Sequence, residues 1–238
     1  MNLLLLDTED FTGSDQAVLT GRRAKHLFEV HKAQAGDQLR VGLIDGCMGQ
    51  AIVTHASETR ATLEAIALTE QPPAPLPVSL LLSLPRPKML RRILQTASAM
   101  GVKHITLING ARVEKSFWQT PFLQPQAIRE QLVLGLEQAK DTRLPTVEFA
   151  KRFKPFVEDE LAGRVTGCQN YVAHPYQATP CPTGVTRAKH CHLAVGPEGG
   201  YVEFEVKKLQ EIGFQAISLG PRILRVETAL PVLLSKLF

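Results

Sequence analysis

The sequence predicts an α/β protein: a C-terminal domain with a mostly parallel sheet, preceded by a small β-barrel domain. From Val78 onward, short apolar runs alternate with helical patterns, which is typical of the βα units of a parallel sheet. Before that point, strand-like runs follow one another with only turns between them. Between the two regions, residues 71–77 contain four prolines, which cannot pair in a sheet and favour an extended linker. We therefore place the first domain at residues 1–71, the linker at 72–77 and the second domain at 78–238.

The first domain is expected to consist mainly of strands. A short amphipathic helix is expected early in this domain, because Ala24, Leu27 and Phe28 recur at helical spacing and the residues between them are largely basic. Turn residues such as Asp45 and Gly46 separate the strand-like runs. The helix is placed at residues 21–32 and the strands at 2–6, 38–44, 49–57 and 59–68.

The second domain is expected to alternate strands with helices. It opens with a buried strand, because residues 78–84 are apolar except for two serines. Pro87 suits the first turn of the helix that follows. The further strands are placed at residues 104–108, 146–149, 169–174, 190–195 and 215–219, and the helices at 87–101, 125–140, 155–161, 203–212 and from the last turn to 238.

Charge gives a local rather than a global signal. The net charge of +4 and the isoelectric point near 8.9 are mild for a nucleic-acid-binding protein. Basic residues nevertheless gather in two short segments. Such clusters can neutralise RNA phosphates, although clusters of this size also occur as solvated faces, so charge alone leaves both interpretations open. The candidate RNA-binding residues are Arg22, Arg23, Lys25, His26 and Lys32 in the first segment, and Arg91 and Arg92 in the second.

Membrane and metal functions are not supported. No apolar run reaches the ~18 residues of a membrane span, and the N-terminal leucines lack the basic flank of a signal peptide. The four cysteines show no CxxC pairing, so we expect a reducing, cytoplasmic setting. Cys181 with the run His190, Cys191 and His192 could suggest a metal site, but adjacent strand residues point to opposite faces and the spacing fits no standard finger. We expect no metal.

Two glycine-containing segments near the C-terminus are the candidate ligand site. Residues 192–200, HLAVGPEGG, predict a strand, a tight loop and then a helix, and residues 219–229, LGPRILRVETA, repeat this order. Loops at the carboxyl ends of strands in an open α/β sheet are where ligands bind. Glycines there let backbone groups approach a ligand without a Cβ in the way. Taken alone, GPEGG could also be a plain tight turn.

The two motifs together resemble the C-terminal region of the RsmE family of SPOUT methyltransferases. That family methylates N3 of a uridine in 16S ribosomal RNA of the small subunit and uses S-adenosylmethionine (AdoMet). The resemblance implies a trefoil knot in the C-terminal domain, a PUA-like RNA-binding N-terminal domain and a homodimer. The last helix is apolar along Leu230, Val232, Leu233, Leu234 and Leu237, which also favours a dimer.

The resemblance also implies roles for individual residues. Arg225 would stabilise the uracil anion, with a surface salt bridge as the alternative. Glu198 would either brace the loop or face the target base. Glu227 and Thr228 would satisfy backbone donors at the start of the last helix and border the cofactor. The full set of implied cofactor-binding residues is Leu193, Gly196, Pro197, Gly199, Gly200, Leu219, Gly220, Ile223, Leu224, Glu227, Thr228 and Ala229.

The middle of the chain departs from the family pattern. Met100 stands in place of a Leu at the end of the first helix, and Asp141 stands where an Arg is expected after the long helix. The Arg-bearing motif after the second strand is retained weakly at Ala111 and Arg112. The cofactor end therefore matches better than the substrate end. A non-catalytic RNA-binding or ribosome-associated protein on the same scaffold is the alternative function.

Overall fold

The computed structural model describes residues 2–238, which form two compact units. One unit holds the chain up to Ala74 together with Val133–Leu144, and the other holds Pro75–Leu132 together with Pro145–Phe238. The long helix α3, Pro125–Ala139, therefore begins in one unit and ends in the other. No helix in the described part of the chain is long and apolar enough to cross a membrane.

The first unit contains a five-stranded sheet in the order β1-β3-β4-β5-β2. Its only parallel pair is β1 with β3, and the other neighbours are antiparallel. Within residues 2–238 no pairing joins β1 to β2, so the sheet is a half barrel, which fits the small PUA-like β domain that we expected. The register shifts at three places along β4 and β5, which bends the sheet. The strands are β1 Leu4–Leu6, β2 Ala17–Thr20, β3 Gln38–Leu43, β4 Met48–Ala56 and β5 Arg60–Glu70.

The predicted amphipathic helix forms at the expected place. It consists of α1, Gly21–His26, and a π-helical segment, Leu27–His31, and it ends at Lys32 with a positive φ of 52°. Ala24 and Leu27 are buried against the sheet together with residues of all five strands. A single 3₁₀ turn, Thr8–Asp10, precedes β2.

The C-terminal part of α3 completes the first unit. Val133 and Leu136 pack with Leu3, Leu5 and Met48 in one buried cluster. The sequence placed this stretch in the second domain, because the 3.6-residue pattern of the helix continues without interruption. An amphipathic pattern shows that a face is buried but not which neighbour covers it.

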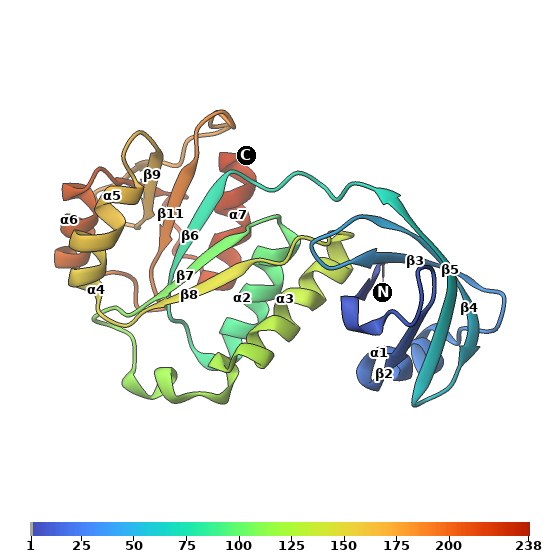
Figure 1. The fold of residues 1–238 in the computed structure, drawn as a ribbon. Coiled ribbons are helices and arrows are strands. Elements are labelled where there is room, and N and C mark those ends of the chain that lie inside the picture. Colours follow the sequence, from blue (N-terminus) through green and yellow to red (C-terminus); the bar gives the residue numbers. More distant parts are fainter. Residues whose placement is uncertain (1) are drawn as a thin grey trace. The chain divides into compact units, whose positions relative to one another are not determined.

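The second unit is built on a seven-stranded sheet in the order β10-β12-β9-β11-β6-β7-β8 (Figure 1). Every pairing in this sheet is parallel, which confirms the predicted α/β class. The strands are β6 Val78–Ser83, β7 His104–Ile108, β8 Thr146–Ala150, β9 Gln169–Ala173, β10 Thr179–Pro180, β11 Cys191–Val195 and β12 Gln215–Ser218. The trefoil knot implied by the family resemblance is a matter of threading and stays a prediction.

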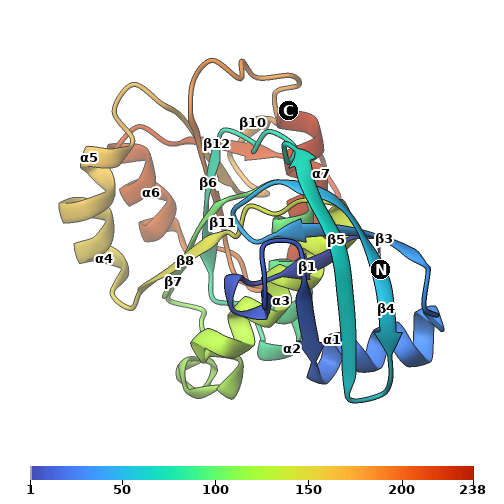
Figure 2. The same cartoon turned by 45° about the vertical axis from the view of Figure 1, so that its right-hand side comes forward.

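Helices cover both faces of the parallel sheet, as such sheets require (Figures 1 and 2). On one face lie α4, α5 and α6 with the π-helical segment that joins α4 to α5. Phe156 and Leu161 of that segment and Leu209 of α6 share a buried cluster with strand residues such as Val172 and Ala194. On the other face α2 packs against α7. The helices are α2 Pro87–Ala99, α4 Phe153–Pro155, α5 Ala162–Arg164, α6 Glu203–Glu211 and α7 Val226–Leu237, with a π-helical segment Phe156–Leu161 joining α4 to α5 and 3₁₀ turns at Lys115–Gln119 and Pro121–Leu123.

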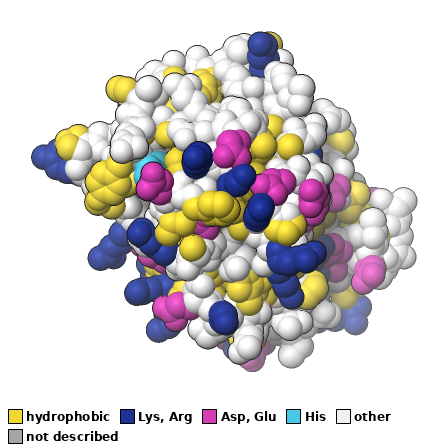
Figure 3. Space-filling model, turned by 90° about the vertical axis from the view of Figure 1, so that its left-hand side faces the viewer, with side chains coloured by type: hydrophobic (Ala, Val, Ile, Leu, Met, Phe, Trp, Pro, Cys, Tyr) yellow, Lys and Arg dark blue, Asp and Glu magenta, His cyan; other side chains and the backbone are white. Residues whose placement is uncertain are grey.

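The outer surface of α4, α5 and α6 mixes charges of both signs. Lys208 pairs with Glu158 at 3.0 Å and with Glu211 at 2.7 Å, and Arg164 pairs with Glu148 at 2.6 Å. Figure 3 shows the face seen from this side, where cationic and anionic side chains lie interspersed with apolar ones. Because opposite charges neutralise each other here, this surface does not resemble a basic patch for RNA.

Candidate functional site

A cavity of about 250 Å³ lies at the carboxyl ends of β9, β11 and β12. These strands are neighbours in the sheet, although they are separated along the sequence, at residues 169–173, 191–195 and 215–218. The carboxyl ends of parallel strands meet at one edge, so the loops that follow them converge. The lining residues are Arg112, Ala173, His174, Pro175, Tyr176, Val195, Gly196, Pro197, Glu198, Gly199, Gly200, Ile217, Ser218, Leu219, Gly220, Arg222, Ile223, Leu224, Val226, Ala229 and Leu233.

The structure brings most of the predicted cofactor residues together in this wall. Both glycine-containing loops contribute, which is the arrangement that the two C-terminal motifs predicted. The lining includes Gly196, Pro197, Gly199 and Gly200 of the first loop, and Leu219, Gly220, Ile223, Leu224 and Ala229 of the second segment. Their role in binding a cofactor stays a prediction.

The first loop is compact because its backbone folds back on itself. A Cβ at Gly196 would lie 2.8 Å from the backbone nitrogen of Tyr201, closer than side chains normally approach, so only glycine fits. Gly200 has a φ of +70° and donates its N–H to the carbonyl of Pro197 at 2.7 Å. The buried Tyr201 hydroxyl donates to the carbonyl of Val195 at 3.3 Å, which ties the loop to the end of β11.

The second loop presents apolar side chains to the cavity. Gly220 has a φ of +112°, a conformation that favours glycine. Ile223 is 70% exposed and Leu224 is 37% exposed, although both are large apolar residues. Exposed apolar side chains that border a cavity are typical of a ligand-binding surface.

Four of the predicted catalytic and cofactor-binding residues lie outside the lining formed by the described residues. Leu193 is fully buried in the middle of β11, where it pairs with Leu80 of β6 and Tyr171 of β9, so it belongs to the core. The other three, Arg225, Glu227 and Thr228, lie at the start of α7. The carbonyl of Arg225 accepts the N–H of Thr228 at 3.0 Å, and no side chain caps this helix.

Glu198 lines the cavity and also fixes its loop. Its Oε1 accepts the backbone N–H of Arg86 at 3.0 Å. Arg86 is the N-cap residue of α2, where backbone donors lack partners within the helix and a carboxylate is favourable. The sequence left two roles open for Glu198, bracing the loop or facing the target base, and this contact supports the first.

Sequence reasoning missed several polar side chains of the wall, among them Arg112, His174 and Tyr176. Arg112 donates through Nη1 to the carbonyl of Gly199. His174 follows β9, and its ring lies 5.9 Å from that of Tyr176, edge to face. Arg112 stood in a motif noted in the sequence, and His174 ended a predicted strand, but neither has a spacing to the glycine loops that would have placed it here.

The loop that carries Arg112 is held by a buried carboxylate. Glu205 accepts the N–H of Ala111 through Oε1 at 2.7 Å and the N–H of Val202 through Oε2 at 2.9 Å. It thereby joins the loop after β7 to the start of α6. Two segments about 90 residues apart are fixed around the cavity by this one side chain.

The candidate RNA-binding residues of the first unit are largely engaged in ion pairs. Arg22 pairs with the buried Glu137 at 3.2 Å, and Arg23 pairs with Asp10 at 2.5 Å. Lys25 lies near Glu29 and Glu58, at 3.6 and 3.5 Å. Burial lowers the pKa of His26 below its ordinary value, and its Nε2 has no hydrogen-bond partner among the described residues. Lys32 is exposed at the end of the helix.

The two candidates of the second unit lie on α2. The guanidinium of Arg91 stands 5.1 Å from the ring centre of Phe122, at a cation–π distance. Arg92 is exposed. Of the exposed cations in the predicted set, Arg22 and Lys25 form ion pairs and Arg91 contacts the Phe122 ring. Lys32 and Arg92 are exposed and form no ion pair or ring contact with any described residue.

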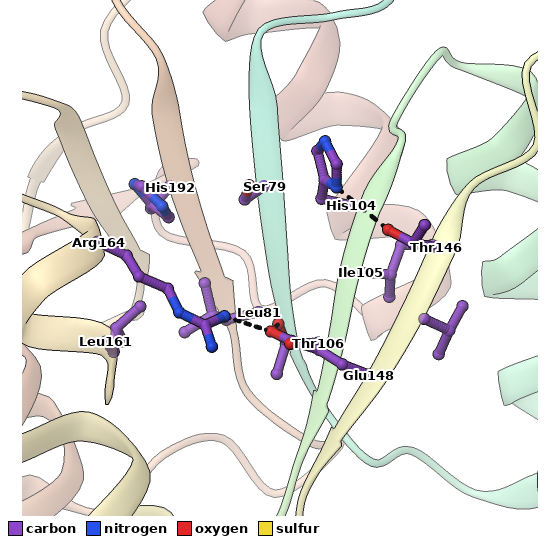
Figure 4. Close-up of a pocket in the computed structure, with 11 residues that line it drawn as sticks. Ser79, Leu81, His104, Ile105, Thr106, Thr146, Glu148, Leu161, Arg164 and His192 are labelled. Atoms are coloured by element: carbon purple, nitrogen blue, oxygen red, sulfur yellow. Dashed lines mark hydrogen bonds and ion pairs between the residues drawn. The ribbon is translucent and has the colours of Figure 1, made fainter. Parts of the chain in front are cut away.

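A second cavity, of about 230 Å³, lies toward the amino ends of β6, β7 and β8 (Figure 4). Its polar side chains have hydrogen-bond partners, several of them within the lining and others, such as Asn170 for His192, outside it. Oε1 of Glu148 accepts from Arg164 at 2.6 Å and from Thr106 at 2.7 Å, and His104 lies 3.1 Å from the hydroxyl of Thr146. Across residues 2–238 no cluster of His, Cys, Asp or Glu is arranged to hold a metal ion. This cavity therefore presents satisfied groups rather than groups that await a ligand.

The comparison with protein families agrees with the glycine-loop cavity. The family model described as an RNA methyltransferase domain matches residues 72–237. This chain belongs to that RNA methyltransferase family. The match covers both glycine-containing loops and Arg112.

Relatives of this RNA methyltransferase extend over nearly its whole length. The ribosomal RNA small subunit methyltransferase E of Treponema pallidum is 29% identical over 233 residues, covering 96% of this chain and 87% of that protein. The protein of the same name from Mycobacterium bovis is 26% identical over 243 residues, covering 98% and 89%. These relatives confirm the RsmE resemblance that the C-terminal motifs predicted.

Solved structures show that the fold is shared. A ribosomal RNA small subunit methyltransferase E from Neisseria gonorrhoeae, bound to S-adenosyl methionine, has a TM-score of 0.75 at 22% identity and covers 98% of this chain and 95% of its own. A methyltransferase from Legionella pneumophila in complex with the same cofactor has a TM-score of 0.78 at 19% identity, with coverage of 98% and 95%.

Proposed function

We propose that this protein is an AdoMet-dependent methyltransferase that modifies N3 of a uridine in 16S rRNA of the small ribosomal subunit. The observation that carries the proposal is the cavity formed by two glycine-containing loops at the carboxyl ends of adjacent parallel strands. Membership of the RNA methyltransferase family and the names of the relatives support the reaction and the rRNA substrate. The neighbouring structures solved with the cofactor support AdoMet.

The cavity wall fits such a cofactor. A Cβ at Gly200 or Gly220 would meet no atom within 4 Å, so these positions leave open space beside exposed backbone. Backbone N–H and C=O groups of the first loop would bind polar groups of the cofactor, and Leu219, Ile223 and Leu224 would pack on the adenine. Leu193, Glu227 and Thr228 would support these loops from the strand and the helix next to them.

Methyl transfer to uracil N3 depends mainly on how the protein positions the base and the cofactor. When bound, AdoMet supplies an electrophilic methyl group, and the uracil must give up its N3 proton to accept it. Arg225, exposed at the start of α7 beside the lining residues Leu224 and Val226, would contact the RNA and stabilise negative charge on the base. Glu198 would contribute by holding the first loop against α2.

The RNA would be bound largely through its phosphates, by Lys32, Arg92 and the other predicted cations that remain accessible. Methylation of ribosomal RNA would place the protein in the cytoplasm. We also propose a homodimer, although the apolar face of α7 does not itself require one. Leu230, Leu233, Leu234 and Leu237 are buried within the chain, and only Val232 of the predicted set is exposed, at 38%.

The decisive experiment is to incubate the purified protein with labelled AdoMet and either small subunits or naked rRNA. Mass spectrometry of nuclease fragments then locates the label. We expect one methyl group on N3 of one uridine. Label on a ribose or a guanine would refute the substrate assignment. Cofactor binding by calorimetry without any label in RNA would favour a non-catalytic RNA-binding protein.

A further inference from the structure

Five side chains in the wall of the glycine-loop cavity carry ionisable groups: Arg112, His174, Tyr176, Glu198 and Arg222. Transfer of a methyl group to uracil N3 requires one acceptor for the N3 proton. The guanidinium groups stay protonated, and a tyrosine phenol is protonated near neutral pH, so neither can accept it. The two remaining candidates are Glu198 and His174.

The carboxylate of Glu198 already has a structural hydrogen-bond partner. Its Oε1 accepts the N–H of Arg86 at the start of α2, where negative charge is favoured. Protonation of this carboxylate would weaken the contact that holds the first loop. Its position therefore suits a structural anion better than a group that gains a proton in each turnover.

His174 has the opposite character. Its backbone is fixed, because its N–H donates to the carbonyl of Ile217 at 2.9 Å. Its ring, by contrast, has a buried nitrogen, Nδ1, that forms no hydrogen bond with any described residue. A buried polar atom without a partner is unfavourable, and in a ligand cavity the missing partner is expected to be the ligand.

The surroundings of His174 keep its imidazole neutral. Burial lowers the pKa of His174 below its ordinary value, and the positive charge of Arg112 lowers it further. Of the other groups around it, Tyr176 contacts the ring edge to face, and Glu198 and Arg222 line the same cavity. A neutral imidazole has a free lone pair at neutral pH, which is what a proton acceptor needs.

We propose that His174 accepts the N3 proton of the target uracil, an inference that rests on the proposed function. The N3–H bond breaks and its proton passes to an imidazole nitrogen of His174. The N3 electron pair forms the bond to the methyl carbon as the carbon–sulfur bond of AdoMet breaks, and its electron pair stays on sulfur. The imidazolium then returns its proton to water. Arg112, beside His174, disfavours the imidazolium and so promotes this return.

The test compares His174→Gln with His104→Gln, a matched change at an exposed histidine outside this cavity. Calorimetry should give wild-type AdoMet affinity, within about threefold, for both variants. Under single turnover, His174→Gln should methylate small-subunit rRNA about 100-fold more slowly or worse, the usual range for loss of a general base. Its rate should rise with pH across the range where the wild-type rate is already level. His104→Gln should match the wild type.

Two further measurements do not depend on the rate of the normal reaction. Histidine ring NMR should show one resonance, absent from His174→Gln, that titrates below the ordinary histidine value of about 6.5. A transcript with 5-fluorouridine, whose N3–H is more acidic, should restore much of the activity of His174→Gln, because less help is needed to remove that proton.

The outcomes separate the two proposals. If the wild type binds AdoMet but methylates no RNA, the proposed function fails and the role of His174 fails with it. If the wild type methylates uridine N3 and His174→Gln does so at the same rate with the same pH profile, only the role of His174 is refuted. Slow methylation that 5-fluorouridine does not restore would also refute it, and would show that His174 merely shapes the site.

Discussion

At the scale of single residues, the backbone contact at Gly196 gives a sharp prediction. A Cβ there would lie 2.8 Å from the nitrogen of Tyr201, and backbone cannot move aside as a side chain can. Gly199 differs, because a Cβ there would meet the Arg112 side chain at 3.0 Å, which can shift. Gly196→Ala should therefore distort the loop and weaken AdoMet binding at least tenfold by calorimetry. Gly163→Ala is the control, since a Cβ at this helical position meets nothing within 4 Å. Equal affinity in the two variants would contradict the assigned site.

His192 gives a prediction about pH. It is buried in β11, and burial, with the nearby His190 and Arg164, lowers its pKa to about 4. The unfolded chain, with a histidine pKa near 6.5, binds more protons below that pH than the folded chain does, so stability falls as pH falls toward 4. From His192 alone we expect the unfolding free energy to be about 2 kcal/mol lower at pH 5 than at pH 8.

Urea unfolding of the wild type and His192→Gln at both pH values checks this. The variant has a lower stability throughout, because it loses the contact between Nδ1 of His192 and Oδ1 of Asn170 at 3.1 Å. The quantity to compare is the difference in unfolding free energy between pH 8 and pH 5, which should be smaller in the variant than in the wild type. A difference as large as in the wild type would mean that His192 is not the titrating group.

At the scale of elements, the join between α1 and the end of α3 predicts that Arg22 acts in stability. The side chain of Glu137 is only 5% exposed, and Arg22, itself 39% exposed, is its ion-pair partner. Burial raises the pKa of Glu137 and Arg22 opposes that rise. Removing Arg22 would leave a buried carboxylate without its partner. Arg22→Ala should lower the unfolding free energy by about 2 kcal/mol, less than for a fully buried pair.

The double variant Arg22→Ala, Glu137→Gln provides the control. Because the neutral amide needs no counter-charge, it should recover part of the lost stability in urea unfolding. A loss in Arg22→Ala below about 0.5 kcal/mol would place this pair among ordinary surface salt bridges.

The elements also show how much of the secondary structure could be predicted from the sequence. Most strands and helices were predicted within a few residues, because each has a periodic pattern or a clear breaker such as Pro87. The two missed strands, Ala17–Thr20 and Thr179–Pro180, are too short to show a period. The order of the strands in the first sheet, in which β1 and β2 lie at the edges, could not be predicted, since it depends on which strands pair and not on local pattern.

The candidate site was predicted where the glycine motifs stand and missed where it depends on distant segments. His174 reaches the cavity because β9 lies between β11 and β12, and Arg112 reaches it from the loop after β7, which is separated from β11 by β6. No spacing along the chain encodes that adjacency. For the same reason Arg22 was read as a cation for RNA, because its partner Glu137 lies 115 residues away.

At the scale of the whole molecule, we expect RNA to be bound by Lys32 and Arg92, the exposed cations of the predicted set that form no ion pair or ring contact with a described residue. Lys32 lies in the first unit and Arg92 in the second, so each tests one unit by itself. Each phosphate contact releases counterions, so the logarithm of the affinity falls linearly with the logarithm of the salt concentration. Removing one phosphate contact should reduce that slope by about 1.

Filter binding of rRNA fragments from low to physiological salt should therefore separate two groups of variants. Lys32→Ala and Arg92→Ala should each weaken binding and flatten the salt dependence while leaving urea unfolding unchanged. Lys207→Ala, which removes an exposed cation on α6, should change neither. Arg22→Ala should lower stability with little change in slope, because its charge is already used by Glu137. A slope reduced as much by Arg22→Ala as by Arg92→Ala would show that the ion pair opens to bind phosphate, and that α1 binds RNA through the residues that also hold it to α3.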